Sequence, residues 1–178
     1  MGKIFVTSDT WFNRPIGKMS EYTTNDYNDT IIANWNKVVG KKDIVYILGG
    51  LGIGDMYHIL VKLNGEIHIL NNFYTQDELT FLDVLKRSVE LSVDKKTKSK
   101  IIFSENQILS IPDLDVILTY LPLMHWCGED TGTFCFHGLI TGSDLINHRI
   151  SCKLEDWGYK PVSIIDIQNN LEKFRKNI

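Results

Sequence analysis

The sequence has few cysteines and no long apolar run. Its three cysteines, Cys127, Cys135 and Cys152, are an odd number without Cys-x-x-Cys spacing, which fits a reducing cytosol better than a disulfide framework. No apolar segment is long enough to span a bilayer, and the N-terminus lacks a basic segment followed by an apolar core and a cleavage site. We therefore expect a cytoplasmic protein with no membrane partner.

A large excess of charge of either sign is also lacking. The chain has 19 Lys and Arg against 22 Asp and Glu, a formal net charge of -3. Overall electrostatics therefore give no strong signal for nucleic acid, although a local basic patch stays open. The 178 residues, 43% of them hydrophobic, predict one domain over residues 1–178 with a single core.

The first 70 residues predict alternating strands and helices. The run from Asp43 to Leu48 is continuously apolar after its first residue, as is typical of a strand buried on both faces. Apolar residues with helical spacing precede and follow this run. Strands are expected at 4–6, 43–48 and 66–70, and helices at 24–39 and 55–63. Such alternation predicts a parallel sheet with helices packed on it.

The pattern changes to short strands from Lys100 onward. Strands are expected at 101–104, 107–111, 116–119, 133–137 and 149–152. Turn residues separate them, which predicts a second, more antiparallel sheet. A helix is expected at 77–91, a solvated lysine-rich turn at 94–100 and a closing helix at 164–174.

The carboxyl end of the first strand carries the first candidate for chemistry. Asp9 follows this strand, and in α/β sheets ligands usually bind at the carboxyl ends of strands. The segments Gly49–Gly54 and Asn71–Tyr74 follow the next two strands and would lie close to Asp9. The glycine spacing matches neither the Walker loop nor the dinucleotide fingerprint, so a tight backbone turn is favoured over a phosphate cradle.

Seven segments spread over nearly the whole chain resemble the calcineurin-like metallophosphoesterases, in particular small bacterial and phage-encoded members. They are KIFVTSDTWF, NDTIIANWNKVV, DIVYILGGLGIGD, KLNGEIHILNN, VILTYLPL, FCFHGLITG and DWGYKPVSIIDI. The resemblance implies a four-layer α/β/β/α sandwich of two mixed β-sheets flanked by helices. It also implies a site for two divalent cations, which polarise a phosphoryl group and generate a hydroxide nucleophile.

The metal-binding motifs that this resemblance implies are degenerate. The motif Asp-x-His corresponds to Asp9-Thr10-Trp11, and the motif Gly-Asp corresponds to Gly49-Gly50. The motif Gly-Asn-His-Asp corresponds to Asn71-Asn72-Phe73-Tyr74. The histidine before a Tyr-Pro-like turn is replaced by Tyr120, and the motif Gly-His-x-His corresponds to Gly138-Leu139-Ile140-Thr141. Only Asp9 and Asn72 remain, and one carboxylate with one amide cannot offset the desolvation of two cations. No cofactor is expected beyond at most one weakly bound divalent cation.

The replacements make a polar site partly aromatic and apolar. We expect a ligand- or partner-binding rim formed by Asp9, Trp11, Asn72, Phe73, Tyr74, Tyr120 and His137. The aromatic members either fill the core or form a surface that stacks a base or anchors a partner. For Asp9 we favour a carboxylate that caps backbone N–H groups over a ligand contact, and for His137 a structural histidine.

Three functions fit this pattern. The first, which the lost ligands favour, is a catalytically inactive metallophosphoesterase-like protein that binds a protein partner, for example a phage-encoded modulator of a host enzyme or defence system. The second is a nucleotide-binding module without hydrolysis. The third is a metal-dependent phosphoesterase with relocated ligands, drawn from Asp9, Asn72 and Asp55.

Overall fold

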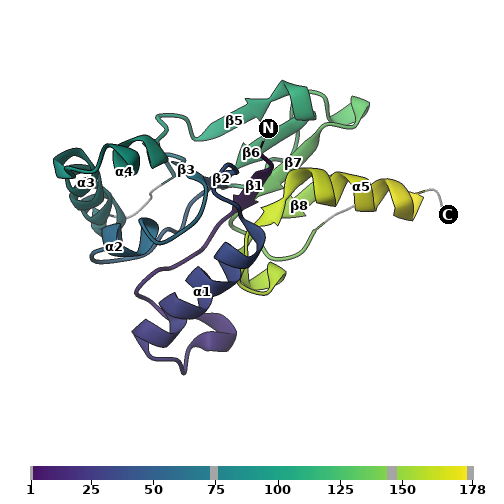
Figure 1. Ribbon diagram of the computed structural model, residues 1–178. Helices are drawn as coiled ribbons and strands as arrows, with labels where there is room; N and C mark the ends of the chain where they lie inside the picture. Colours follow the sequence, from purple (N-terminus) through teal and green to yellow (C-terminus); the bar gives the residue numbers. More distant parts are fainter. Residues whose placement is uncertain (1, 73–75, 144–147, 176–178) are drawn as a thin grey trace.

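The computed structural model describes residues 2–72, 76–143 and 148–175, which form two central β-sheets flanked by helices (Figure 1). The first sheet has the strand order β4-β3-β2-β1-β9. Its strands are β1 (Ile4–Thr7), β2 (Ile44–Ile47), β3 (Glu66–Ile69), β4 (Ile101–Phe103) and β9 (Val162–Ser163). The strands β1 to β4 are parallel, and β9 pairs antiparallel with β1. The predicted parallel sheet of the first 70 residues is therefore confirmed.

The second sheet has the order β5-β6-β7-β8. Its strands are β5 (Ile108–Ile111), β6 (Val116–Thr119), β7 (Phe134–His137) and β8 (Arg149–Ser151). Only β5 and β6 are antiparallel, whereas β6, β7 and β8 run parallel. The expected antiparallel character is wrong because long connections separate the last three strands and let the chain return before each new strand. The strand at 101–103 also belongs to the first sheet, where it extends the parallel series beside β3.

The helices match the sequence pattern at the long elements and depart from it at the short ones. They are α1 (Thr24–Val38), α2 (Tyr57–Leu60), α3 (Gln76–Leu91), α4 (Lys95–Lys100) and α5 (Ile164–Arg175), with short 3-10 helices η1 (Gly17–Met19), η2 (Pro112–Leu114), η3 (Glu129–Thr131) and η4 (Leu154–Trp157). The expected turn at 94–100 is instead α4, and Asp94 Oδ2 accepts a hydrogen bond from Thr97 Oγ1 at 2.8 Å at its start. The helix expected at 55–63 is shortened to α2.

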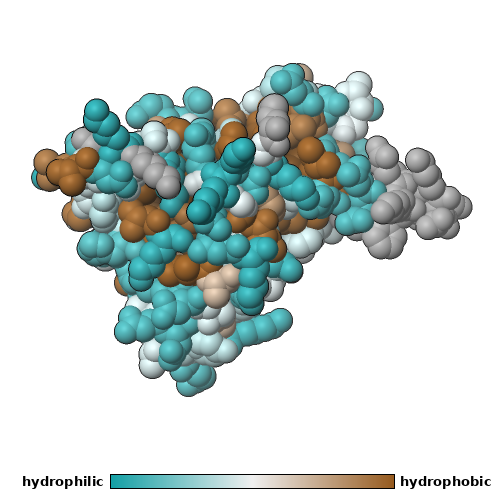
Figure 2. Space-filling model, in the orientation of Figure 1, coloured by the Kyte–Doolittle hydropathy of each residue, from teal (hydrophilic) through white to brown (hydrophobic). Residues whose placement is uncertain are grey.

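Two large clusters of buried apolar side chains form the core. One lies between the first sheet and the helices α1 to α3, and includes Trp35, Ile47 and Ile67. The other lies between the two sheets and includes Val6, Leu118 and Phe136. On the face shown in Figure 2, hydrophilic side chains cover most of the surface, with apolar patches among them. Within the described ranges, no helix has the length and apolar character needed to cross a membrane.

The two sheets join where β1 and β8 end. Ser8 forms a parallel bridge with Lys153, beyond the last residue of each strand. The Ser8 N–H donates to the Cys152 carbonyl at 2.9 Å, and the Leu154 N–H donates to the Ser8 carbonyl at 3.0 Å. Since Asp9 is the next residue along the chain, this junction places its side chain between elements of both sheets.

Candidate functional site

The backbone from Asp9 to Asn13 is strained and is held against the glycine-rich segment after β2. Asp9, Trp11 and Asn13 have φ angles of 53°, 41° and 64°, in the left-handed region that non-glycine residues rarely adopt. The N–H groups of Asp9 and Trp11 donate to the carbonyls of Gly49 and Gly50, each at 2.9 Å. These hydrogen bonds fix the unfavourable backbone and aim the Asp9 side chain at the sheet junction.

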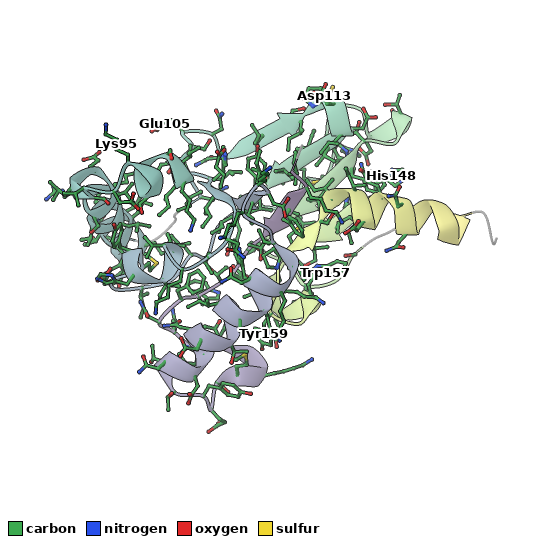
Figure 3. All side chains as sticks on the ribbon, viewed as in Figure 1. Lys95, Glu105, Asp113, His148, Trp157 and Tyr159 are labelled. Carbon is green, nitrogen blue, oxygen red and sulfur yellow. The ribbon has the colours of Figure 1, made fainter. Side chains whose placement is uncertain are left out.

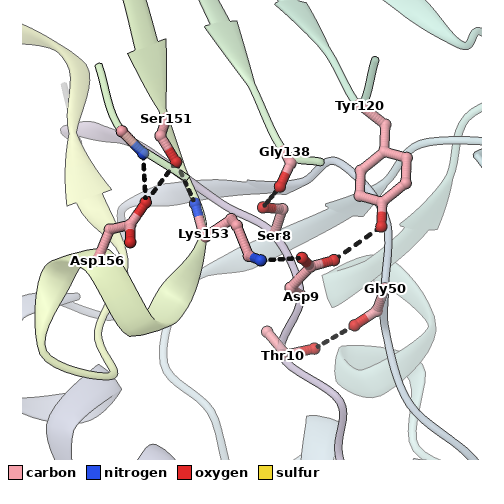
Figure 4. A network of polar contacts seen from close by, with 10 residues as sticks. Ser8, Asp9, Thr10, Gly50, Tyr120, Gly138, Ser151, Lys153 and Asp156 are labelled. Atoms are coloured by element: carbon pink, nitrogen blue, oxygen red, sulfur yellow. Dashed lines mark hydrogen bonds and ion pairs between the residues drawn. The ribbon is translucent and has the colours of Figure 1, made fainter. Parts of the chain in front are cut away.

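The Asp9 carboxylate is buried and held by two side chains (Figure 4). Its Oδ1 accepts a hydrogen bond from the Tyr120 hydroxyl at 2.8 Å, and its Oδ2 lies 3.6 Å from the Lys153 ammonium. The expected capping of backbone N–H groups by this carboxylate is therefore wrong for the contacts that the structure describes. Burial raises the pKa of Asp9 from 3.8 to about 6, while the Tyr120 hydrogen bond and the Lys153 charge oppose that rise.

Three glycines make room for this arrangement. A Cβ at Gly50 would lie 2.2 Å from Asp9 Oδ1, and a Cβ at Gly49 would lie 2.7 Å from the Tyr120 ring. A Cβ at Gly138 would lie 2.5 Å from Tyr120 Cδ2. The Tyr120 ring therefore occupies a space bounded by two backbone segments that only glycine leaves open.

Asn72 joins the two sheets by hydrogen bonds to backbone. Its Nδ2 donates to the Leu48 carbonyl at 2.9 Å and to the Gln107 carbonyl at 3.1 Å. The side chain is buried, and both amide hydrogens have an acceptor. Asn72 therefore ties the end of β2 to the start of β5, next to Gly49.

The other residues expected at the rim do not all gather at Asp9. Trp11 is partly exposed, and the Arg14 guanidinium carbon lies 5.4 Å from the centre of its ring, a cation–π contact. His137 is buried, and strand alternation points it away from Phe136 and the space between the sheets. Burial lowers the pKa of His137. Phe73 and Tyr74 lie outside the described residues.

Sequence reasoning missed Lys153, which supplies the positive charge beside Asp9. No local pattern marks it, because the contact depends on the bridge between Ser8 and Lys153 that joins the two sheets. Another side chain at this junction is fixed internally, since Ser8 Oγ donates to the Gly138 carbonyl at 3.1 Å.

Three exposed apolar side chains, Leu121, Leu139 and Ile140, follow directly after Tyr120 and Gly138, and we call them the apolar loops. The Leu139 N–H donates to the Tyr120 carbonyl at 2.9 Å, which holds the two loops together. Their exposed fractions are 46%, 43% and 53%. The site thus combines a buried polar centre with an apolar border, a combination typical of interaction surfaces.

Few side chains that could ligate a metal ion lie near Asp9 among the described residues. Asp55, a candidate for a relocated ligand, is at the start of α2, where its Oδ1 accepts from the Tyr57 N–H at 3.1 Å and its Oδ2 lies 3.5 Å from His58 Nε2. Among residues 2–72, 76–143 and 148–175, no group of three or more His, Cys, Asp or Glu side chains could hold a metal ion. Asp9 and Asn72 remain the donors to be considered.

The architecture is a mixed α/β fold with two mixed sheets flanked by helices. No protein-family model matches the chain. The chain is similar to an uncharacterized protein, MJ1445, of Methanocaldococcus jannaschii, with 41% identity over 81 residues, covering 38% of this chain and 43% of the archaeal protein. It therefore matches less than half the length of that relative.

A solved structure with a similar fold is the protein of unknown function AQ665 from Aquifex aeolicus. The TM-score is 0.60, and the match covers 95% of this chain and 99% of the other. The sequence identity is 17%, so the likeness concerns the fold alone.

Proposed function

We propose that this chain is a catalytically inactive protein of the metallophosphoesterase type that binds a protein partner beside the apolar loops. The four-layer α/β/β/α arrangement is part of the same proposal. Its support is the resemblance of the motifs together with one observation at the site. Asp9, the carboxylate that the first motif would give to a metal ion, is engaged by Tyr120 and Lys153 instead.

The residues around Asp9 do not suit two divalent cations. The motif position for a bridging carboxylate is Gly50, where even a Cβ would lie 2.2 Å from Asp9 Oδ1. Asn72 donates both amide hydrogens to backbone carbonyls, which fixes the orientation of its amide group. A cation pair requires several oxygen or imidazole donors with fixed geometry, and this donor set supplies one carboxylate and one amide.

Lys153 offers a physical explanation of why Asp9 persists in such a site. A buried carboxylate is costly unless it is paired with a positive charge and hydrogen-bonded. The ammonium of Lys153 supplies that charge, and the Tyr120 hydroxyl supplies the hydrogen bond. We infer that these two side chains take the place that a cation would have beside the Asp9 carboxylate.

The apolar loops favour a partner with an apolar face. Leu121, Leu139 and Ile140 are exposed. Exposed apolar side chains provide the anchors of an interface. A phage-encoded modulator of a host enzyme or defence system is one form of such a protein.

The test of inactivity is an assay with bis-p-nitrophenyl phosphate and Mn²⁺, supported by metal analysis of the purified protein. We expect no hydrolysis above the rate of a protein-free blank and less than stoichiometric metal. Hydrolysis by the wild type that is abolished in Asp9→Ala would instead establish a phosphoesterase with relocated ligands.

Partner binding is tested by capture from host lysate with the double variant Leu139→Ser/Ile140→Ser. Its matched control is Leu79→Ser, which removes a similarly exposed leucine from α3. We expect the wild type and the control to capture the same protein and the double variant to lose it. Equal capture by all three proteins would contradict a role for the apolar loops.

A further inference from the structure

A cavity of about 430 Å³ opens at the amino end of the first sheet. Its lining comprises Lys41, residues 61–66, Asp94, Thr97, Ser99 and Lys100. The strand β3 begins at Glu66, within this lining, whereas Asp9 follows the carboxyl end of β1. Because β1 and β3 run in the same direction, the cavity and the Asp9 site lie at opposite ends of the sheet.

One wall of this cavity is fixed to α1. The Asn36 side chain accepts from the Asn64 N–H at 2.7 Å and donates to the Lys62 carbonyl at 2.9 Å. Trp35 Nε1 donates to the Asn64 carbonyl at 3.0 Å, and Asn64 Nδ2 donates to the Val39 carbonyl at 3.1 Å. The loop between α2 and β3 is therefore held in place without a ligand, which lowers the entropic cost of binding one.

Lys100 adds a fixed positive charge to the lining. Lys100 Nζ donates to the carbonyls of Leu60 at 3.2 Å and Val61 at 3.1 Å, and also to the carbonyl of Leu63. These contacts satisfy carbonyl groups at the end of α2, where a cation is favourable. They also hold the ammonium group of Lys100 at the cavity, between α4 and the loop after α2.

The charge balance of the lining is positive. Lys41 and Lys62 are exposed, and the structure gives neither ammonium group a hydrogen bond or ion pair with another described residue. The two acidic side chains of the lining have partners already. Glu66 Oε1 lies 2.7 Å from His68 Nε2, and Asp94 Oδ2 accepts from Thr97 Oγ1.

More lysines belong to the same segments. Lys42 follows Lys41 in the turn before β2, and α4 begins with Lys95 and ends with Lys100. Lys95 lies at the end of the molecule away from His148 and Trp157 (Figure 3). A chain with a net charge of -3 thus gathers positive charge at one edge of one sheet.

We propose that this cavity binds a small phosphorylated molecule of nucleotide size. Lysine ammonium groups bind phosphate as point charges, and the two exposed lysines can reach a ligand whose position the rigid walls define. The volume lies in the range of small-molecule sites, roughly 300–1,000 Å³. A concave site of this size suits a mononucleotide better than a duplex or a flat lipid surface. The proposal is independent of partner binding at the apolar loops.

The test is isothermal titration calorimetry of the full chain with ATP, pyrophosphate and inorganic phosphate. We expect saturable binding of ATP that weakens at least tenfold in the double variant Lys41→Glu/Lys62→Glu. The control, Lys18→Glu/Lys160→Glu, makes the same change in net charge at two exposed lysines outside the lining and should keep the affinity within twofold. Thermal unfolding of both variants shows whether they are folded.

Three outcomes would overturn the proposal. The first is no heat of binding with any of the three probes at millimolar concentration. The second is an equal loss in the two double variants, which would indicate nonspecific attraction of anions. The third is tighter binding of a 20-base-pair DNA duplex or of anionic phospholipid vesicles than of ATP, which would make the lysines a docking surface for that larger anion.

Discussion

The two ends of the first sheet treat charge in opposite ways. At the carboxyl end, the Asp9 carboxylate is buried and has both a hydroxyl and an ammonium partner within the protein. At the amino end, Lys41 and Lys62 line an open cavity and have no such partner among the described residues. The negative charge at the carboxyl end is therefore neutralised within the protein, whereas the positive charges at the amino end can pair with a bound ligand.

The carboxyl end of the first sheet is where a ligand would be expected, yet here it is filled by protein side chains. Parallel α/β sheets usually bind ligands at the carboxyl ends of their strands. In this chain the Tyr120 ring fills the space between Gly49 and Gly138 at that end. The carboxyl end of this sheet is therefore a packed centre, with the apolar loops beside it.

The largest expected effect comes from Gly50→Ala at the packed end. The added Cβ would meet Asp9 Oδ1 at 2.2 Å and Asp9 Cα at 2.8 Å, on a residue with a φ of 62°. Backbone strain and overpacking together should lower the free energy of unfolding by about 3–5 kcal/mol, measured by urea denaturation.

Gly158→Ala is the matched control for this substitution. Gly158 has a similar φ of 66°, but a Cβ there would meet nothing within 4 Å. It should therefore cost only about 1 kcal/mol. Equal losses in the two variants would mean that backbone conformation, and not the closeness of Asp9, governs this end of the sheet.

The sequence was sufficient for the elements with a strong apolar pattern and insufficient for the pairing between them. The run before Gly49 predicted β2, and the spacing around Trp35 predicted α1. The membership of β4 in the first sheet and the direction of β7 could not be read, because strand alternation does not specify the neighbouring strand. α4 was missed because a short lysine-rich segment has no apolar periodicity.

The candidate site was predictable only in part, for a related reason. Asp9 could be found from its place after the first strand, and Tyr120 from the resemblance of its motif. The pairing of Asp9 with Lys153 could not, because it depends on a bridge between residues at the ends of two different sheets. Long-range contacts of this kind leave no local pattern in the sequence.

A second prediction concerns the pH dependence of stability at the packed end. The pKa of Asp9 is raised to about 6 in the folded protein, against 3.8 as the ordinary value. A carboxyl group whose pKa is higher in the folded than in the unfolded protein stabilises the folded state at low pH. This contribution is fully present below the unfolded-state pKa of 3.8 and is lost as the pH rises through the folded-state pKa of about 6. The loss for the wild type is about 3 kcal/mol in total.

Asp9→Asn removes this pH dependence. The free energy of unfolding of the variant, relative to the wild type, should therefore rise by up to about 3 kcal/mol between pH 3.5 and pH 7.5. Urea denaturation at a series of pH values measures it, and Asp83→Asn on the exposed face of α3 controls for the loss of one negative charge. A difference that stays flat across this range would contradict the burial of an ionisable group at the sheet junction.

The smallest of the three effects expected around Asp9, and the sharpest test of the contrast between the two ends, comes from Tyr120→Phe. The ring still fills the space between the two glycines, and only the hydroxyl that donates to Asp9 at 2.8 Å is removed. A hydrogen bond to a charged acceptor contributes about 1.5–3 kcal/mol, so a loss of about 2 kcal/mol in unfolding free energy is expected at pH 8. Because this bond also lowers the pKa of Asp9, the loss should shrink at pH 4, where the carboxyl is protonated.

The counterpart at the amino end, Lys62→Ala, should change stability by less than about 0.5 kcal/mol, since surface substitutions without partners have little effect. If Lys62→Ala cost as much as Tyr120→Phe, the lysines would be structural, and the two ends of the sheet would not differ in the way proposed.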